Sequence, residues 1–269
     1  MPAPRSPLLN RGRREAASHE VRHHRAHAPD GVAIAYTHWR RPAVELLVLA
    51  PGFWRVRLGR ENLFLANHFL RRGYDVVALD FRGHGDSGGG YAFGSEEHND
   101  FTAVIEELVG PGRTYERFAV LGLSMGGSIA AQALAARPDL PCRALAMISS
   151  PADLRALRPK PWKLGAMRQV RLRHALRVPK LASRGFGDRK PRADEAVASL
   201  AFPKLIVTSK GDWLVDPSHG RALAEASLAP VDLVHLDLPG SLHADGLVEA
   251  VPVQLLRVLD RWFAKNAPP

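Results

Sequence analysis

The sequence has one cysteine, no long apolar run and a shortage of acidic residues. Cys142 alone cannot form an intramolecular disulfide or a C-x-x-C redox pair. No stretch of 18 consecutive apolar residues occurs, which argues against a membrane-spanning helix. The 27 Asp and Glu residues are outnumbered by 37 Lys and Arg residues, and the formal net charge is +10. These shortages exclude a disulfide-stapled scaffold and favour a basic globular protein.

The composition is sufficient for one large hydrophobic core. The chain has 269 residues, of which 46% are hydrophobic. Helix and strand patterns alternate along it with short Gly and Pro punctuation, which predicts a mostly parallel sheet covered by helices. Cys142 precedes the apolar segment 144–148, so we interpret it as a packed core residue and not as a nucleophile. We therefore expect an α/β fold.

The N-terminal segment is basic and lacks the apolar stretch that a secretory signal requires. We expect a flexible arm over residues 1–28 and a cytoplasmic protein. A metal site built from His19, His23, His24 and His27 is the alternative, but no carboxylate or cysteine completes a ligand set. A solvated arm without a metal is the favoured interpretation.

The most informative segment is Gly122-Leu123-Ser124-Met125-Gly126, between the apolar run 118–121 and the small-residue stretch 127–134. This pattern predicts a strand, a sharp turn that carries one serine, and a helix. Side chains at positions 122 and 126 of such a turn would collide with the neighbouring strand and helix, so glycine fits there. Ser124 is then either a nucleophile beside a helix N-terminus or an N-cap. The motif alone does not decide between the two.

Two further residues complete a possible catalytic set. A serine nucleophile needs an imidazole to accept its proton and a carboxylate to orient that imidazole. Asp212 follows the predicted strand 204–209, and His243 follows the strand that begins at Val231. Because the loops after parallel strands meet at one edge of a sheet, the three side chains are expected to converge. The order Ser124, Asp212, His243 is typical of one architecture, and it predicts a catalytic triad.

Alternatives exist for two of the three roles. Asp153, which follows the predicted strand before the basic segment, is the rival acid, and Asp212 would then only shape a turn. His219 and His235 lie inside a predicted helix and a predicted strand, where they are poorer bases than His243. The remaining possibility is that His243 is a loop histidine with no chemical role. We favour Asp212 and His243.

At this point the sequence resembles the α/β-hydrolases, and within them the serine esterases of the monoacylglycerol lipase and lysophospholipase type. The segments that carry the resemblance are 80–87, 122–126, 211–217 and 240–243, in the order of that family. The resemblance implies an eight-stranded, mostly parallel sheet flanked by helices, with a lid insertion after the sixth strand. It also implies a reaction that uses no cofactor and no metal.

The resemblance further implies an oxyanion hole made by the backbone N–H groups of Phe53 and Met125. One departure is notable, since members commonly have His-Gly where this chain has Pro51-Gly52. Pro51 removes no donor from position 53, but the usual side-chain tether of the loop is missing. The geometry of this loop is therefore an open question for the structure.

Several other side chains are candidates near the site. Arg82 and His84, in the glycine-dense segment 81–90, are either substrate contacts or, in the favoured interpretation, hydrogen-bonded braces of the loop. The candidate substrate-binding side chains are Trp54, Trp162 and Trp213.

The segment 151–203 has its own character. It contains 13 Lys or Arg residues against 4 Asp or Glu residues. We expect core regions over 29–150 and 204–269 and a basic lid between them. The lid is interpreted either as an ordinary solvated face or as a contact for an anionic lipid surface or anionic substrate. Nucleic acid is not expected, because no binding motif accompanies the charge.

Together these features predict an enzyme that cleaves carboxylic esters through an acyl-enzyme on Ser124. The expected substrates are acylglycerol-like or lysophospholipid-like esters, or small esters. A thioesterase with the same triad is the alternative, followed by a non-catalytic ligand-binding relative. Dehalogenases and epoxide hydrolases of related fold need a carboxylate nucleophile, so a serine at position 124 argues against both.

Overall fold

The computed structural model describes residues 20–40, 43, 45–159, 179–183, 190–228, 230–237 and 242–269. Eight strands form one sheet in the order β1-β2-β4-β3-β5-β6-β7-β8. Neighbouring strands from β4 to β8 run parallel, whereas β2 is antiparallel to both β1 and β4. The strands are β1 (Glu20–His27), β2 (Ala33–Arg40), β3 (Leu46–Ala50), β4 (Asp75–Leu79), β5 (Phe118–Leu123), β6 (Cys142–Ile148), β7 (Lys204–Ser209) and β8 (Val231–Leu236).

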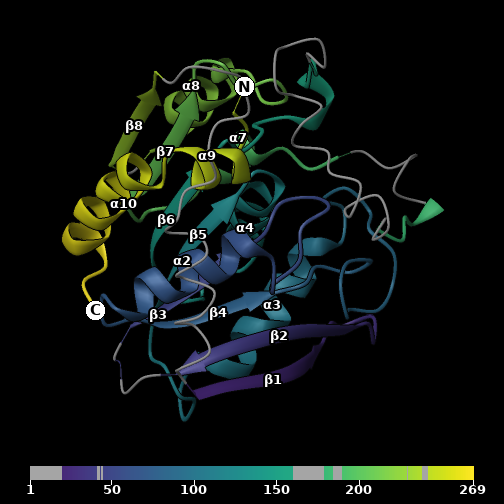
Figure 1. Cartoon of the computed structure of the whole chain (residues 1–269). Helices are drawn as coiled ribbons and strands as arrows, with labels where there is room; N and C mark the ends of the chain where they lie inside the picture. The colour runs from purple at the N-terminus through teal and green to yellow at the C-terminus, as the bar shows by residue number, and fades with distance from the viewer. Residues whose placement is uncertain are drawn as a thin grey trace.

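Helices cover both faces of this sheet (Figure 1). One face packs against α3, α4, α7 and α8, and the other packs against α2, α9 and α10. This arrangement confirms the expected mostly parallel, eight-stranded sheet flanked by helices. The helices are α2 (Arg60–Leu70), α3 (Glu97–Leu108), α4 (Met125–Ala136), α7 (Ala193–Val197), α8 (Pro217–Ala226), α9 (Asp245–Ala250) and α10 (Pro252–Asn266), with a short 3-10 helix η2 (Leu154–Ala156).

The central strands are apolar on both sides because helices cover both faces. Every residue of β3, β4 and β5 is buried, which explains why these segments are continuous apolar runs without alternation. Since β3 to β8 run parallel, their carboxyl ends open onto one edge of the sheet. The loops that follow β3, β5 and β7 therefore meet, although they lie far apart in the sequence.

The expected flexible arm over residues 1–28 is wrong for residues 20–27, which form the edge strand β1. The strand was hidden in the sequence because it is polar: only Ala26 is buried, so no apolar alternation marks it. The segment is ordered because it pairs with β2, although its composition does not indicate a strand. Strand alternation places His24 on the opposite face from His23 and His27, so these three do not share a ligand sphere. Residues 1–19 lie outside the described part of the chain.

The insertion after β6 begins and ends against the core. The described parts of segment 151–203 are residues 151–159, 179–183 and 190–203. Near its end, α7 buries Ala193 and Val197 beside α4 and α8. Within the described residues, no helix has the length and apolar character needed to cross a bilayer.

Candidate active site

Ser124 occupies a strained turn between β5 and α4. Its backbone angles are φ 52° and ψ −126°, a left-handed conformation that costs a residue with a side chain free energy. The chain must pass directly from a buried strand into a helix, and this turn raises the serine side chain above the strand ends. Such strain on a non-glycine residue is common where a side chain has a chemical task.

The surrounding glycines are required by close backbone approach, as the sequence predicted. A Cβ on Gly122 would lie 2.2 Å from the Cα of Gly127, and a Cβ on Gly126 would lie 2.1 Å from the carbonyl oxygen of Ala50. Either side chain would force β5, β3 and α4 apart. The N-cap interpretation of Ser124 is wrong, because its side chain makes no capping hydrogen bond to α4.

The structure brings Ser124, His243 and Asp212 into one hydrogen-bonded line. The His243 Nε2 atom lies 2.8 Å from the Ser124 Oγ atom. On the other side of the ring, Nδ1 lies 2.9 Å from Oδ2 and 3.1 Å from Oδ1 of Asp212. All three side chains are buried. The arrangement allows a proton to leave the hydroxyl for an imidazole that a carboxylate orients.

Asp212 is held rigidly for this purpose. Its Oδ1 atom accepts the backbone N–H groups of Leu214 (2.9 Å) and Val215 (3.0 Å) in the loop after β7. The rival acid, Asp153, instead accepts the backbone N–H of Arg155 (2.9 Å) and pairs with its guanidinium at the start of η2. The geometry therefore favours Asp212 as the partner of the histidine.

The two rival histidines are engaged elsewhere. His219 Nδ1 accepts the backbone N–H of Ala152 at 3.3 Å, and His235 Nδ1 lies 2.6 Å from Thr208 Oγ1. His235 lies on the last strand of the sheet, as the sequence indicated.

A cavity of about 330 Å³ opens beside the Ser124 hydroxyl. Its wall is mostly apolar and includes two of the three tryptophans singled out in the sequence, Trp54 and Trp213. Trp213 also contacts His243 edge-on, with ring centroids 6.2 Å apart. Trp162 lies outside the described residues. The other apolar side chains of the wall are Phe53, Phe93, Leu123, Met125, Pro151, Leu154, Leu157, Leu214, Val215 and Ala244.

The two candidate oxyanion donors belong to this cavity. Met125 is the first residue of α4, and Phe53 follows Gly52 in the loop after β3. This loop passes close to the serine, because a Cβ on Gly52 would lie 3.1 Å from the Ser124 Cβ. The two residues therefore flank Ser124 from different elements.

One end of the cavity is polar, which the sequence analysis missed. Arg55 Nη2 pairs with Asp245 Oδ2 at 2.7 Å, and Glu61 and Asn62 from the start of α2 complete this polar corner. Burial, with Asp245 nearby, raises the pKa of Glu61 to about 7. The members of the corner come from distant parts of the chain. Only the position of Asp245, two residues after His243, offered a signal.

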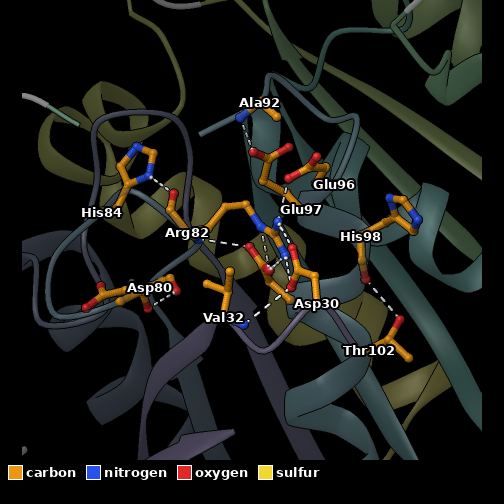
Figure 2. A network of polar contacts seen from close by, with 12 residues as sticks. Asp30, Val32, Asp80, Arg82, His84, Ala92, Glu96, Glu97, His98 and Thr102 are labelled. Carbon is orange, nitrogen blue, oxygen red and sulfur yellow. Dashed lines mark hydrogen bonds and ion pairs between the residues drawn. The ribbon is translucent and has the colours of Figure 1, made fainter. Parts of the chain in front are cut away.

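Arg82 is a brace and not a substrate contact. Its guanidinium is almost fully buried and bonds to Asp100 and Asp30 at 2.7 Å and to Glu96 at 2.5 Å (Figure 2). These carboxylates join the β1–β2 turn, the loop after β4 and the start of α3. His84, two residues on, lies against the loop that carries Phe53 and Trp54.

Comparisons with known proteins agree with this architecture. The sequence model of the family described as "Serine aminopeptidase, S33" matches residues 42–193, more than half of the chain. Among curated proteins, none matches the sequence.

Solved structures with the same fold include several hydrolases. The esterase Pf2001 of Pyrococcus furiosus is 19% identical, with a TM-score of 0.71 over 93% of this chain and 91% of that chain. The esterase RhEst1 of Rhodococcus sp. ECU1013 is 20% identical, with a TM-score of 0.68 over 91% and 99% of the two chains. Mouse alpha/beta hydrolase domain-containing protein 10 is 15% identical, with a TM-score of 0.66 over 91% and 99%. At these identities the likeness concerns the fold.

Proposed function

The chain belongs to the serine aminopeptidase S33 family of α/β-hydrolases, and on this premise we propose that it hydrolyses carboxylic esters through Ser124. The observation that carries the proposal is the continuous line from Asp212 through His243 to the Ser124 hydroxyl at the edge of an apolar cavity. A structural role would not require a strained serine, a buried imidazole and a buried carboxylate in this geometry.

The proposed reaction follows from these contacts. His243 takes the proton of Ser124 while the oxygen attacks the substrate carbonyl, and Asp212 stabilises the imidazolium that forms. The proton then passes from His243 to the leaving alcohol, which leaves an acyl-enzyme. A water molecule, deprotonated by His243, attacks the acyl-enzyme, and the acid departs with Ser124 restored.

The negative oxygen of the tetrahedral intermediate needs fixed donors. We assign this role to the backbone N–H groups of Phe53 and Met125, which flank Ser124. The N–H of Met125 lies at the N-terminus of α4, where the helix dipole also favours negative charge. In a serine protease, loss of one such donor costs about 2.7–4 kcal/mol.

The cavity suggests which ester fits. Its apolar wall suits an acyl chain, and the polar corner of Arg55, Glu61 and Asp245 suits a hydroxylated alcohol. Among the described residues of this corner, Arg55 is already paired with Asp245 and Glu61 adds a further carboxyl, so these residues offer no unpaired cation for a phosphate. This favours an acylglycerol-like substrate over a lysophospholipid-like one.

The basic insertion is proposed to steer anionic substrates or lipid surfaces toward this cavity. Much of the insertion lies outside the described residues, so the support for this role is the excess of Lys and Arg in its sequence. A contact of this kind weakens as salt screens it.

A substrate profile tests the proposal. Purified protein is assayed with p-nitrophenyl esters from acetate to palmitate, and Ser124→Ala is expected to lose about 10⁶-fold in turnover, by analogy with serine proteases. Undiminished activity in this variant would remove Ser124 from the mechanism.

Two further substrates test the alternative activities. The matching acyl-coenzyme A tests thioesterase activity, and an aminoacyl p-nitroanilide tests aminopeptidase activity. Hydrolysis of an anionic lysophospholipid at rising salt tests the insertion, with an uncharged monoacylglycerol as the reference, and a flat salt dependence with the anionic substrate contradicts its proposed role.

A non-catalytic protein would give a different result. Ser124 would then fail to react with a fluorophosphonate probe, and every ester would be left intact. The proposed function predicts labelling of the wild type and none of Ser124→Ala.

A further inference from the structure

The loop after β3 lacks the side-chain tether that a histidine in place of Pro51 would supply, yet it must hold the Phe53 N–H in position. Trp54, the next residue, is strained, with φ 64°. Its backbone N–H donates to the His84 Nε2 atom at 2.9 Å. We propose that His84 is a positioning residue that fixes the oxyanion loop by accepting this hydrogen bond. The inference rests on the proposed function, in which Phe53 supplies an oxyanion donor.

The two contacts of the His84 ring define its tautomer. Nδ1 lies 3.1 Å from the carbonyl oxygen of Arg82, a group that can only accept, so Nδ1 carries the proton (Figure 2). Nε2 then presents a lone pair to the Trp54 N–H. Protonation of the ring would remove this acceptor. Burial lowers the pKa of His84 to about 4, so the ring stays neutral near neutral pH.

The ring is fixed by what surrounds it. His84 is 5% exposed and contacts Tyr91 and Phe53 edge-on, with ring centroids 4.8 Å and 5.6 Å away. The carbonyl that orients it belongs to Arg82, whose backbone N–H and guanidinium both bond to buried Asp100. A second bond from the same region reaches the same loop, because Asp80 accepts the backbone N–H of Arg57 at 2.6 Å.

These contacts explain the glycine-dense sequence around His84. A Cβ on Gly85 would lie 2.1 Å from Asp80 Oδ2, and a Cβ on Gly83 would lie 2.3 Å from the carbonyl oxygen of Lys180. The Lys180 backbone N–H also donates to the Gly83 carbonyl oxygen at 2.9 Å. The segment is therefore packed tightly against Lys180 at Gly83 and against Asp80 at Gly85, which leaves the ring little freedom to move.

The geometric link to catalysis is short. The Trp54 N–H and the Phe53 N–H lie on successive peptide planes that share the Phe53 Cα atom, so anchoring one plane limits the rotation of the other. An oxyanion donor acts at about 2.7–3.1 Å, and a displacement of about 1 Å can cost on the order of 100-fold in rate. Loss of the bond should therefore lower kcat and leave ground-state substrate binding intact.

Two variants separate the two bonds of the ring. In His84→Asn, the side-chain amide takes the place of Nδ1, keeps the donor to the Arg82 carbonyl and leaves nothing at Nε2. In His84→Gln, an amide oxygen takes the place of Nε2 and can again accept the Trp54 N–H. We expect His84→Asn to lower kcat about 10- to 100-fold with KM within about 3-fold, and His84→Gln to recover most of the loss. His98→Asn, a half-buried histidine on α3, is the matched control and should retain wild-type kcat.

A transition-state readout and a direct readout of the bond accompany the kinetics. Affinity for an alkyl boronic acid, which mimics the tetrahedral intermediate, should fall in step with kcat/KM in His84→Asn. Hydrogen exchange at the Trp54 amide should be faster in His84→Asn than in the wild type and slow again in His84→Gln. Equal kcat in the Asn and Gln variants, or a change confined to KM, would overturn the inference.

The wild-type protein supplies a test that needs no substitution. Long-range ¹H–¹⁵N spectra at pH 7 should show His84 as the Nδ1–H tautomer, and the Nε2–H tautomer would contradict the proposal. The outcomes also separate this inference from the proposed function. If Ser124-dependent hydrolysis is absent, the proposed function fails, while the tautomer and the Trp54 exchange still decide whether His84 holds the loop.

Discussion

His243 and His84 both lie near the oxyanion loop and are buried to the same degree, 6% and 5% exposed. Both rings have both nitrogens hydrogen-bonded, but to different kinds of partner. His243 bridges a carboxylate and a hydroxyl, which lets it accept a proton and return it. His84 bridges a carbonyl and an amide, which lets it only donate at one atom and accept at the other. Partners, not burial, decide what a buried histidine can do.

Replacing His243 should produce the largest effect of the remaining tests. His243→Asn removes the imidazole bonded to Ser124, and by analogy with serine proteases kcat should fall about 10⁶-fold. Steady-state hydrolysis of a p-nitrophenyl ester measures this loss. Equally small losses of kcat in His243→Asn and His84→Asn would contradict the different roles assigned to the two histidines.

Replacing the orienting acid should have the next largest effect. Asp212→Asn preserves the shape of the side chain but removes the charge that stabilises the imidazolium, so kcat should fall on the order of 10⁴-fold. Asp153→Asn is the matched control, because Asp153 was the rival acid and bonds to Arg155. A large loss in Asp153→Asn with none in Asp212→Asn would exchange their assignments.

The smallest effect concerns Glu61, a buried titratable group in the polar corner of the cavity. Because folding raises its pKa from 4.5 to about 7, its contribution to stability is fully present below about pH 4.5 and is lost as the pH rises through 7. Glu61→Gln should therefore match the wild type near pH 4.5 and be more stable well above pH 7, by about 3 kcal/mol.

Urea unfolding at pH 5 and pH 8.5 measures this difference. The control is Glu225→Gln, which changes an exposed glutamate on α8 and should alter stability at neither pH. A Glu61→Gln variant that is less stable than the wild type at pH 8.5 would show that the ionised carboxylate is favourable in the fold. Burial acts on Glu61 and His84 in the same sense: it raises the pKa of Glu61 to about 7 and lowers that of His84 to about 4, so in both it disfavours the charged form.

Much of the core was predictable because its signals are local. The runs 118–121 and 204–209 are predictable as strands because both are buried along their whole length. The strand β1 was missed for the opposite reason. It is an edge strand whose polar residues face solvent, so neither alternation nor hydrophobicity reveals it.

The candidate site likewise has one part that the sequence predicts and another that it does not. Ser124, Asp212 and His243 were predictable, since each follows a recognisable strand and the three occur in a characteristic order. The polar corner was not, because Arg55 and Asp245 are separated by 190 residues and neither belongs to a pattern. The pairing of side chains across such distances depends on how the loops are placed, which no local period encodes.

The sequence by itself determined the strained serine turn, the order of the triad and the alternation of strands and helices, because sterics and hydrophobic periodicity act between near neighbours. Only the tertiary structure decided that Asp212 and not Asp153 meets His243, that Arg82 is a buried brace, and that a histidine 30 residues away holds the Trp54 amide. The last of these contacts joins a side chain to a backbone N–H, a group that every residue except proline carries. The sequence cannot mark which amide is used, so the fold must bring the two atoms together.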